Sequence, residues 1–306
     1  MKKTVLIFGA SGFVGRYLSD EFHNNGYEVY GSDLFRSESI PEYMSFYECD
    51  LLDSQKTEEL ILSVKPSHIV DLAAVSSVGL SWKIPQKTVA VNVEGTLNIL
   101  EAARKCESDP RILLIGSSEE YAVSDKPLNE ESPLNANNPY GISKTMQEQF
   151  SEIYIRRFGM KIYRVRAFNH IGVGQPDNFV IPSWCKQAAL ISKSGHGGTI
   201  NVGNLDVMRD FSDVRDVVRA YRMVIESDDC TQVYNIGSGK AVLLRELLNN
   251  IISLSDQPIK VNIDSNLFRP ADNPFICCDN GLIKNKLGWQ PQFEVFETVR
   301  EIYKSF

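Results

Sequence analysis

Two residues whose types could move a proton, Tyr140 and Lys144, stand four positions apart in the stretch YGISK. Asn138 is a good helix cap and Pro139 suits a first helical position, so the sequence predicts a helix that begins here. Residues at i and i+4 share one helical face, which would place the ammonium beside the phenol and lower its pKa from about 10. The pair predicts that Tyr140 gives or takes a proton at a carbonyl or alcohol oxygen.

A hydroxyl group upstream would complete such a site. The apolar run RILLI is followed by Ser117 and Ser118, where a buried strand should end. One hydroxyl could hydrogen-bond a substrate oxygen beside Tyr140, and the other serine could serve as a turn former. The Y-x-x-x-K spacing is common by chance on surface helices, so this interpretation depends on the motifs around it.

A glycine-rich loop near the N-terminus is the most informative of these motifs. In GASGFVG, Gly9, Gly12 and Gly15 follow an apolar run and open a helical pattern. The first glycine permits a tight turn, the second lets the backbone approach a pyrophosphate, and the third allows close packing of helix on strand. The N–H groups at the helix start then face the phosphates. The predicted dinucleotide site also includes the intervening Ser11, Phe13 and Val14.

Acidic residues after the next apolar runs bear on which dinucleotide binds. Asp33 follows the last loop glycine by 18 residues, where a carboxylate accepts hydrogen bonds from the adenosine ribose and repels a 2′-phosphate. Arg36 lies close by and could accept that phosphate, so we expect NAD(H) or NADP(H), with NAD(H) preferred. Asp50 could meet the adenine or, with equal weight, cap a helix. The expected site includes the neighbouring Leu34 and Leu51.

Short apolar runs alternate with helical patterns over the first two-thirds of the chain. The expected buried strands are Val5–Phe8, Glu28–Gly31, His68–Leu72, Ile112–Ile115 and Ile162–Val165. The expected helices are Arg16–Asn25, Thr57–Val64, Thr88–Lys105 and Tyr140–Phe158, the last with an apolar stripe of Met146, Phe150, Ile153 and Tyr154. This alternation predicts an α/β fold with a Rossmann-type, doubly wound parallel sheet.

The rhythm is looser after residue 170. We expect a dinucleotide-binding core over residues 1–170, to which residues 213–240 return. Most of residues 171–306 should then form a smaller C-terminal lobe that binds the substrate.

Composition limits the remaining possibilities. The 306 residues are 43% hydrophobic, as in globular proteins, and a net charge of -7 without a basic stripe argues against nucleic acid. No apolar run approaches the roughly 18 residues of a membrane span, and the N-terminal run is too short for a signal peptide. We therefore expect a cytoplasmic protein without a membrane partner. The six cysteines lack metal-ligand spacing, so we expect reduced thiols and no metal.

The glycine loop, DLAA at 71–74, NVEGT at 92–96, GSSEEYA at 116–122 and YGISK at 140–144 together resemble the extended short-chain dehydrogenase/reductases. These are nucleotide-sugar epimerases, dehydratases and reductases. The resemblance implies that a Ser-Tyr-Lys set catalyses hydride transfer between a nicotinamide and C4 of a sugar. It also implies further cofactor-binding residues, namely Leu72, Ala73, Ala74, Asn92, Phe168 and His170.

Three more stretches are similar to the GDP-sugar branch of this family, above all to the GDP-4-keto-6-deoxy-mannose reductases. They are RAFNHIGVGQ from 166, GNLDVMRDFSDVRDVVRAY from 203 and RPAD from 269. By this resemblance a GDP-linked sugar contacts Ser118, Glu119, Asn169, Arg209, Arg269 and Asp272. The planar fork of an arginine suits phosphate oxygens, although Arg209 could instead pair with a neighbouring aspartate.

Glu119 leaves the reaction open. The SSE stretch resembles the Thr-Ser-Glu of GDP-mannose 4,6-dehydratases, in which the glutamate acts at C5 and C6 of the sugar. The chain is short for a dehydratase, so we expect reduction of a C4 keto group, giving GDP-rhamnose or a related sugar. A dehydratase or epimerase, and a non-catalytic NAD(P) sensor, are the alternatives. The family also implies a homodimer through the helices near 85–105 and 140–158.

Overall fold

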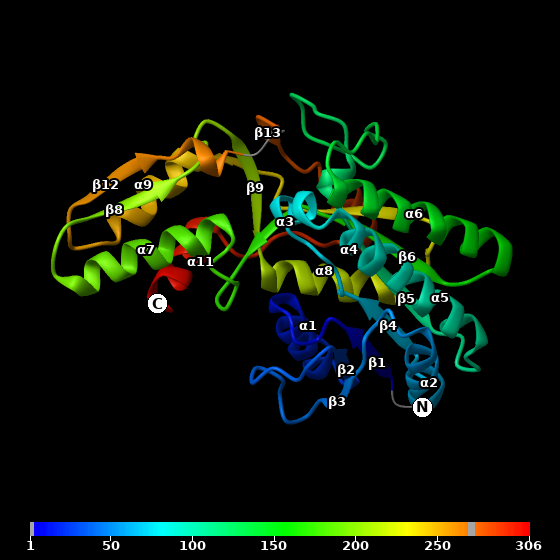
Figure 1. Cartoon of the computed structure of the whole chain (residues 1–306). Helices are drawn as coiled ribbons and strands as arrows, with labels where there is room; N and C mark the ends of the chain where they lie inside the picture. The colour runs from blue at the N-terminus through cyan, green and yellow to red at the C-terminus, as the bar shows by residue number, and fades with distance from the viewer. Residues whose placement is uncertain (1–2, 269–272) are drawn as a thin grey trace. The chain divides into compact units, whose positions relative to one another are not determined.

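The structure is a computed structural model that describes residues 3–268 and 273–306 (Figure 1). Arg269 and Asp272, both expected to contact the substrate, lie outside the described residues. The chain divides into two compact units. Unit 1 is Met1–Ala122, Glu130–Ala167 and Val218–Asn235, and unit 2 is Val123–Asn129, Phe168–Val217 and Ile236–Phe306. Within the described ranges, no helix combines the length and hydropathy needed to cross a bilayer.

Unit 1 is built on a seven-stranded sheet with the order β10-β6-β5-β4-β1-β2-β3. Its strands are β1 (Thr4–Phe8), β2 (Glu28–Asp33), β3 (Ser45–Glu48), β4 (His68–Asp71), β5 (Arg111–Ser117), β6 (Ile162–Ala167) and β10 (Val233–Ile236). Strands β1 to β6 pair in parallel. The strand order reverses between β1 and β4. In open α/β sheets ligands bind beyond the carboxyl ends of the strands at such a point. The predicted α/β class with a doubly wound parallel sheet is confirmed.

The edge strand β3 was not predicted. Its four residues, SFYE, are exposed or partly exposed, so they lack the apolar run that marks a buried strand. Strand β10 forms the opposite edge of the sheet and comes from far downstream in the chain.

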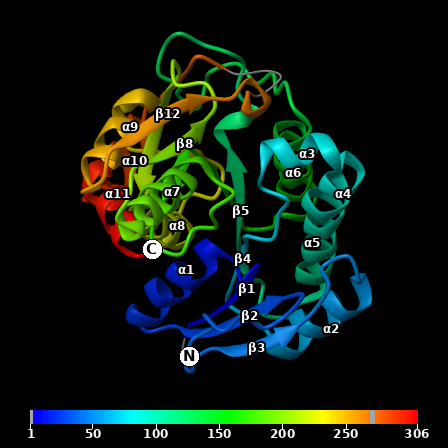
Figure 2. The ribbon, with the colours of Figure 1, turned by 60° about the vertical axis from the view of Figure 1, so that its left-hand side comes forward.

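Helices cover both faces of this sheet (Figure 2). One face carries α1 (Phe13–Asn24) and α8 (Val214–Glu226), and the other carries α2 (Ser54–Val64), α5 (Gly95–Lys105) and α6 (Pro139–Phe158). The single helix predicted over Thr88–Lys105 is instead α4 (Pro85–Val89), a π-helical segment (Ala90–Glu94) and α5. Such π segments inside helices are frequent at functional sites.

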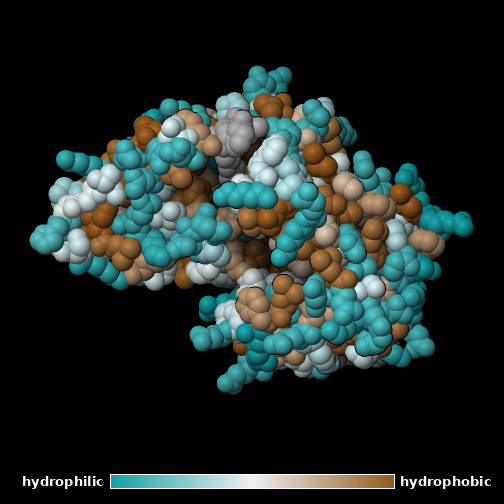
Figure 3. Space-filling model, viewed as in Figure 1, coloured by the Kyte–Doolittle hydropathy of each residue, from teal (hydrophilic) through white to brown (hydrophobic). Residues whose placement is uncertain are grey.

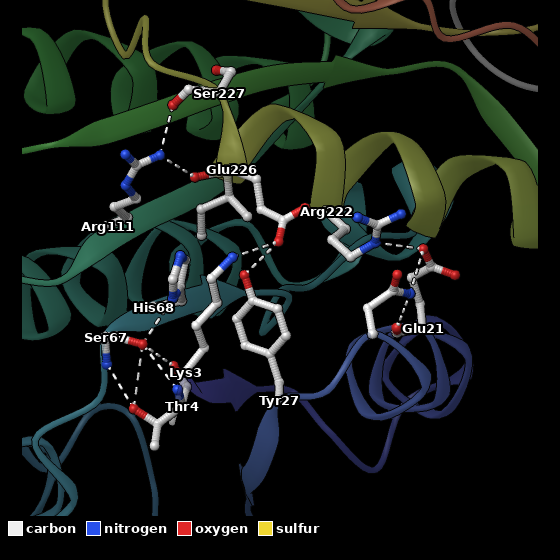
Figure 4. Close-up of polar contacts among 12 residues, drawn as sticks. Lys3, Thr4, Glu21, Tyr27, Ser67, His68, Arg111, Arg222, Glu226 and Ser227 are labelled. Atoms are coloured by element: carbon white, nitrogen blue, oxygen red, sulfur yellow. Dashed lines mark hydrogen bonds and ion pairs between the residues drawn. The ribbon is translucent and has the colours of Figure 1, made fainter. Parts of the chain in front are cut away.

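A polar network holds α8 against the strands and α1 of unit 1 (Figure 4). Tyr27 donates a hydrogen bond to Glu226 at 2.7 Å, and Arg222 bridges Glu226 and Glu21, both also at 2.7 Å. The neighbouring His68 is buried, and burial lowers its pKa to about 4, so it is neutral at neutral pH. These contacts fix the position of α8, the helix that carries Tyr221.

Unit 2 has its own core. Its helices are α7 (Val180–Ser194), α9 (Leu244–Ser253), α10 (Gly281–Leu287) and α11 (Val295–Lys304). One small sheet contains β7 (Asn169–Ile171), β9 (Met208–Asp213), β11 (Ala241–Leu243) and β13 (Phe275–Ile276), and the other pairs β8 (Gly198–Val202) with β12 (Ile259–Ile263). The core packs around Ile181, Trp184, Phe211, Leu247 and Val299. All six cysteines of the chain are free thiols.

Candidate active site

The glycine loop connects β1 to α1 and is shaped by two close approaches. Gly9 has a φ of 78°, and a Cβ there would lie 2.7 Å from the backbone nitrogen of Ala73. A Cβ at Gly15 would lie 2.4 Å from the carbonyl oxygen of Ala10. A Cβ at Gly12 would come closest to the Gly9 oxygen, at 3.2 Å, and no side chain caps α1 there. The loop therefore offers an open backbone surface at a helix N-terminus, which fits a dinucleotide pyrophosphate.

Asp33 ends β2 and is tied to this loop. Its Oδ2 accepts a hydrogen bond from the Ser11 N–H at 3.0 Å, and its Oδ1 accepts one from the Leu34 N–H at 2.8 Å. An ionised carboxylate has about four acceptor positions, so both oxygens keep capacity for ribose hydroxyls. Arg36 is exposed two residues beyond Leu34, with its guanidinium 5.7 Å from the centre of the Phe46 ring.

The structure tests the alternative role expected for Asp50, that of a helix cap. The cap of α2 is Asp53, which accepts a hydrogen bond from the Lys56 N–H at 3.1 Å. Asp50 is exposed and accepts one from the Leu52 N–H at 3.0 Å, which stabilises a turn. The expectation that Asp50 could cap the helix is therefore wrong, because the cap lies three residues later. The neighbouring Leu51 is buried in the core.

Ser117 and Tyr140 meet where β5 ends and α6 begins. Asn138 caps α6 by accepting a hydrogen bond from the Gly141 N–H, and its own amide donates to Glu119, both at 2.9 Å. A Cβ at Gly141 would lie 2.3 Å from the Glu119 carbonyl oxygen, so a glycine lets the helix start directly against the turn after Ser117. In this position the Ser117 hydroxyl lies close to the Tyr140 phenol and acts to lower its pKa. The serine and tyrosine expected to act together are therefore neighbours.

The pKa of Tyr140 lies above its ordinary value. Burial is the largest cause, and the hydrogen bond from Ser117 opposes it. Lys144 is directed elsewhere, because its Nζ donates to Gln147 Oε1 at 2.9 Å, and burial lowers the pKa of its ammonium. Burial therefore dominates the pKa of Tyr140 in this structure, where the ammonium is hydrogen-bonded to the next turn of α6. The expected effect of Lys144 on the phenol stays a prediction.

Lys144 is part of a buried polar network. Gln147 Nε2 donates to Thr96 Oγ1 at 3.0 Å and lies 3.4 Å from Asp71 Oδ2, and Thr96 donates to the same aspartate oxygen at 2.8 Å. The charge of Asp71 acts to raise the pKa of Lys144, against the effect of burial. No motif pointed to this network, but a glutamine and a threonine at sheet-facing positions of two helices are a signal that could have found it.

The residues expected from DLAA and NVEGT lie around the chain that follows β4. Asn92, in the π-helical segment, accepts a hydrogen bond from the Val75 N–H at 2.8 Å and donates to Ser143 at 2.9 Å. Leu72 donates its N–H to the Phe8 carbonyl oxygen. Ala73 and Ala74 follow directly, and Ala73 packs against Gly9. These contacts join the end of β4 to both the glycine loop and α6.

Two further residues near Tyr140 were not singled out in the sequence. Tyr221 on α8 is buried, and burial followed by the neighbouring Tyr140 raises the pKa of its phenol. Glu120 is fully buried. It directly follows Ser118 and Glu119, the expected substrate ligands. The sequence alone does not show that this glutamate is completely buried in a turn.

The remaining expected residues belong to unit 2 and are described by themselves. Asn169 donates to the Asp210 carbonyl oxygen at 3.3 Å, and burial lowers the pKa of His170, whose Nδ1 lies 3.1 Å from the Phe168 carbonyl oxygen. Arg209 is buried on β9 and donates to the Met208 carbonyl oxygen at 2.9 Å. The Asp210 carboxylate accepts from the N–H groups of residues 238, 239 and 278.

Comparison with known proteins places the chain in a family. Residues 6–302 match the model of the family described as GDP-mannose 4,6 dehydratase. The chain is 28% identical to "GDP-6-deoxy-D-mannose reductase" of Pseudomonas aeruginosa over 305 residues, which is 99% of this chain and 96% of the relative. It is 28% identical to "GDP-mannose 4,6-dehydratase" of Yersinia enterocolitica over 347 aligned positions, which is 98% of this chain and 92% of the relative.

A solved structure gives the same answer. The chain superimposes on RMD from Pseudomonas aeruginosa, solved in complex with NADPH, with a TM-score of 0.86 and 27% identity over 99% of this chain and 98% of the other. The chain belongs to the GDP-mannose 4,6-dehydratase family of the extended short-chain dehydrogenase/reductases. It is accordingly an enzyme of a class of NAD(P)-dependent oxidoreductases that act on nucleotide sugars.

Proposed function

We propose that this enzyme uses NADH or NADPH to reduce the C4 keto group of a GDP-linked 4-keto-6-deoxy sugar. The contact between the Ser117 hydroxyl and the Tyr140 phenol carries the proposal, because the two groups can hold one carbonyl oxygen between them. Similarity to a reductase over nearly the whole of both chains supports it. The product would be GDP-rhamnose or a related GDP-deoxy sugar.

Each member of the set has a role in this reaction. The bound nicotinamide supplies a hydride to C4. Tyr140 donates its proton to the C4 oxygen, and the Ser117 hydroxyl donates a hydrogen bond that stabilises the same oxygen as negative charge develops. Once the Lys144 ammonium leaves Gln147, it stabilises the phenolate that remains and would hold the nicotinamide ribose. Burial keeps the phenol protonated beforehand, which suits a proton donor.

The glycine loop and Asp33 are the proposed cofactor ligands. The backbone from Gly9 to Gly15 would hold the pyrophosphate, and the Asp33 carboxylate would accept hydrogen bonds from the adenosine ribose. Because this carboxylate repels a 2′-phosphate, NAD(H) is the preferred cofactor. The other proposed contacts follow the sequence, namely Ser11, Phe13, Val14, Leu34, Asp50, Leu51, Leu72, Ala73, Ala74, Asn92, Phe168 and His170.

Replacement of Asp33 tests this preference. In Asp33→Ser we expect the NADH dissociation constant to rise by about 10- to 100-fold, the effect of losing a hydrogen bond to a charged group. The NADPH constant should rise less, because a repulsive charge is also removed. Fluorescence titration of both reduced cofactors measures this, with Asp109→Asn, at an exposed acid outside the proposed site, as the matched acid-to-neutral control. Equal effects on the two cofactors would contradict the assignment.

The nucleotide sugar is the proposed substrate, and the side chains named for it are Ser118, Glu119, Asn169, Arg209, Arg269 and Asp272. Arginine presents a planar fork that matches phosphate oxygens, so Arg209 and Arg269 suit the GDP diphosphate. Glu119 is hydrogen-bonded to the Asn138 cap, which supports a role in holding a sugar hydroxyl near Tyr140.

A dehydratase is the second candidate, favoured by Glu119 in an SSE turn. Length favours the reductase, because the alignment with the dehydratase is 347 positions long and this chain has 306 residues. Incubation with GDP-mannose alone, and separately with a GDP-4-keto-6-deoxy sugar plus NADH, tests the choice. NADH consumption with the keto sugar only would support reduction. Loss of water from GDP-mannose without added cofactor would instead identify a dehydratase, and binding of NADH without any turnover a sensor.

We also propose a homodimer through the helical layer of α4, α5 and α6. Large apolar side chains are exposed on this layer, including Ile142 and Ile153 on α6 and Val89 on α4. Sedimentation velocity should show a dimer that Ile142→Asp weakens, while Leu190→Asp, an exposed apolar position on α7, should not. A monomer at micromolar concentration would contradict the proposal.

A further inference from the structure

Glu120 is a fully buried carboxyl group directly behind Ser117. Its Oε1 accepts a hydrogen bond from the Ser117 N–H at 2.7 Å, and a Cβ at Gly116 would lie 2.4 Å from the same oxygen. Its backbone carbonyl accepts a hydrogen bond from the Asn135 N–H at 3.0 Å. The side chain is therefore folded back under the end of β5, where it fixes the peptide of the serine that contacts Tyr140.

The charges around Glu120 come from two other elements. Glu148 and Lys144 lie on α6, and Arg166 lies on β6. Arg166 is engaged by Glu148, with Nε 3.0 Å from Oε2 and Nη2 2.5 Å from Oε1, and it also donates to Tyr121 at 2.9 Å. In the part of the chain that the structure describes, Oε2 of Glu120 has no hydrogen-bond partner.

This environment favours the uncharged acid. A carboxylate without water needs a cation or several donors of its own, and here the guanidinium is already paired with another carboxylate. Burial, followed by the charge of Glu148, raises the pKa of Glu120 to about 8, and the Ser117 N–H, Arg166 and Lys144 oppose the rise. Glu120 is thus protonated at neutral pH and titrates when the solution becomes mildly alkaline.

We propose that Glu120 is a positioning residue that must be uncharged during catalysis, and that its ionisation weakens Tyr140 as a proton donor. The inference rests on the proposed reduction, in which Tyr140 becomes a phenolate. A negative charge on Glu120 raises the pKa of Tyr140, because it disfavours a second negative charge nearby. The same charge favours the Lys144 ammonium, but this cation is hydrogen-bonded to Gln147. The proton of Glu120 is lost to solvent and takes no part in the chemistry itself.

The first arm of the test is the pH dependence of keto-sugar reduction. Glu120→Gln keeps an Oε1 acceptor for the Ser117 N–H and removes the titration, so its kcat at neutral pH should stay near that of the wild type. In the wild type kcat should fall above about pH 8, by about tenfold for each unit by which the charge raises the pKa of Tyr140. Glu120→Gln should lack this fall. Glu42→Gln, the same change at an exposed acid, should retain it.

The second arm measures unfolding and needs no substrate. The folded-state pKa of Glu120 lies above its unfolded value of about 4.3, so the folded protein binds more protons between these values and loses stability as pH rises through the interval. Denaturation midpoints should therefore fall less steeply with pH in Glu120→Gln than in the wild type or Glu42→Gln. This arm still reads the charge of Glu120 if no keto sugar is reduced, a result that would remove the proposed function alone.

Two results would overturn the inference: matching pH profiles of kcat in wild type and Glu120→Gln, or matching pH dependence of unfolding. Glu148→Gln supplies an independent check if the first variant folds poorly. It removes the like charge and releases Arg166, so the alkaline fall in kcat should move to lower pH. A fall that moves upward, or stays in place, would contradict the proposal.

Discussion

Helices α5 and α6 pack on the same face of the sheet but bury opposite kinds of side chain. The buried face of α5 is almost entirely apolar and includes Ile99, Leu100 and Ala103. The buried face of α6 consists of small or polar residues, among them Lys144 and Gln147. One helix therefore removes apolar surface from water, while its neighbour lines the sheet with hydrogen-bonding groups.

The difference shows where stability and chemistry are separated in this unit. The fully buried side chains of Ile99 and Leu100 on α5 each contribute roughly 1.5–3 kcal/mol by their burial. A buried lysine costs stability unless partners compensate, and here the partners are Gln147 on α6 and, through Gln147, the acid Asp71 at the end of β4. The cost falls at the helix that holds Tyr140, where the proposed reaction needs a desolvated ammonium and phenol.

The comparison also corrects the expected apolar stripe on α6. Ile153 is 49% exposed, and the hydroxyl of Tyr154 points outward to Glu101 on α5 at 2.6 Å. Met146 and Phe150 are only partly buried. Of the four residues only Tyr154 packs against the apolar core, because the sheet-facing positions before it are taken by Lys144 and Gln147.

The largest expected effect is the loss of the α6 phenol. Tyr140→Phe should reduce turnover by about 10²- to 10⁴-fold, the size of a general-acid contribution, with little change in stability. Steady-state reduction of the keto sugar measures it. Tyr154→Phe, the same change further along the helix, is the control. Turnover near that of the wild type in Tyr140→Phe would exclude the tyrosine as proton donor.

The next effect should fall on α5 and have the opposite character. Ile99→Ala should lower the free energy of unfolding by about 2–5 kcal/mol, because it removes a fully buried side chain from the core. Turnover per folded molecule should stay close to the wild type. Urea denaturation combined with active-site titration separates the two quantities. A clear fall in turnover per folded molecule would show that α5 is not the purely structural member of the pair.

A smaller effect is expected from the network beneath α6. In Asp71→Asn the pKa of Lys144 loses its main upward influence, so the ammonium should lose its proton at lower pH. The alkaline limit of kcat that Lys144 sets should then move to lower pH, and it is read in the Glu120→Gln background, which lacks the fall assigned to Glu120. The pH–rate profile measures this, with the exposed Asp109→Asn as control. An unchanged limit would mean that the charge of Asp71 does not control the pKa of Lys144.

The smallest effect should come from the exposed sides of the two helices. Arg104 on α5 forms a surface ion pair with Glu101 at 2.6 Å and lies 4.9 Å from the centre of the Phe158 ring of α6. Arg104→Ala should cost less than about 1 kcal/mol and should matter less at high salt. Chemical denaturation at two ionic strengths tests this. A larger, salt-independent loss would show that the helices depend on this outer contact.

Local signals in the sequence accounted for the frame of unit 1. The apolar runs placed five strands, because parallel strands buried on both faces must be apolar throughout. Gly9, Gly12 and Gly15 marked the loop because close backbone approaches exclude a Cβ there. Asn138 and Pro139 marked the start of α6, since capping chemistry is local. Strand β3 escaped because an edge strand needs no such run.

Only the tertiary structure decided the electrostatics and the partners of the site. Whether Lys144 faces Tyr140 or Gln147 depends on Asp71 and Thr96, which lie tens of residues away in the chain and meet it only after the sheet has formed. The state of Glu120 likewise follows from enclosure by β5, β6 and α6. Burial and long-range charge are sums over neighbours brought together by folding, so no spacing along the chain could reveal them.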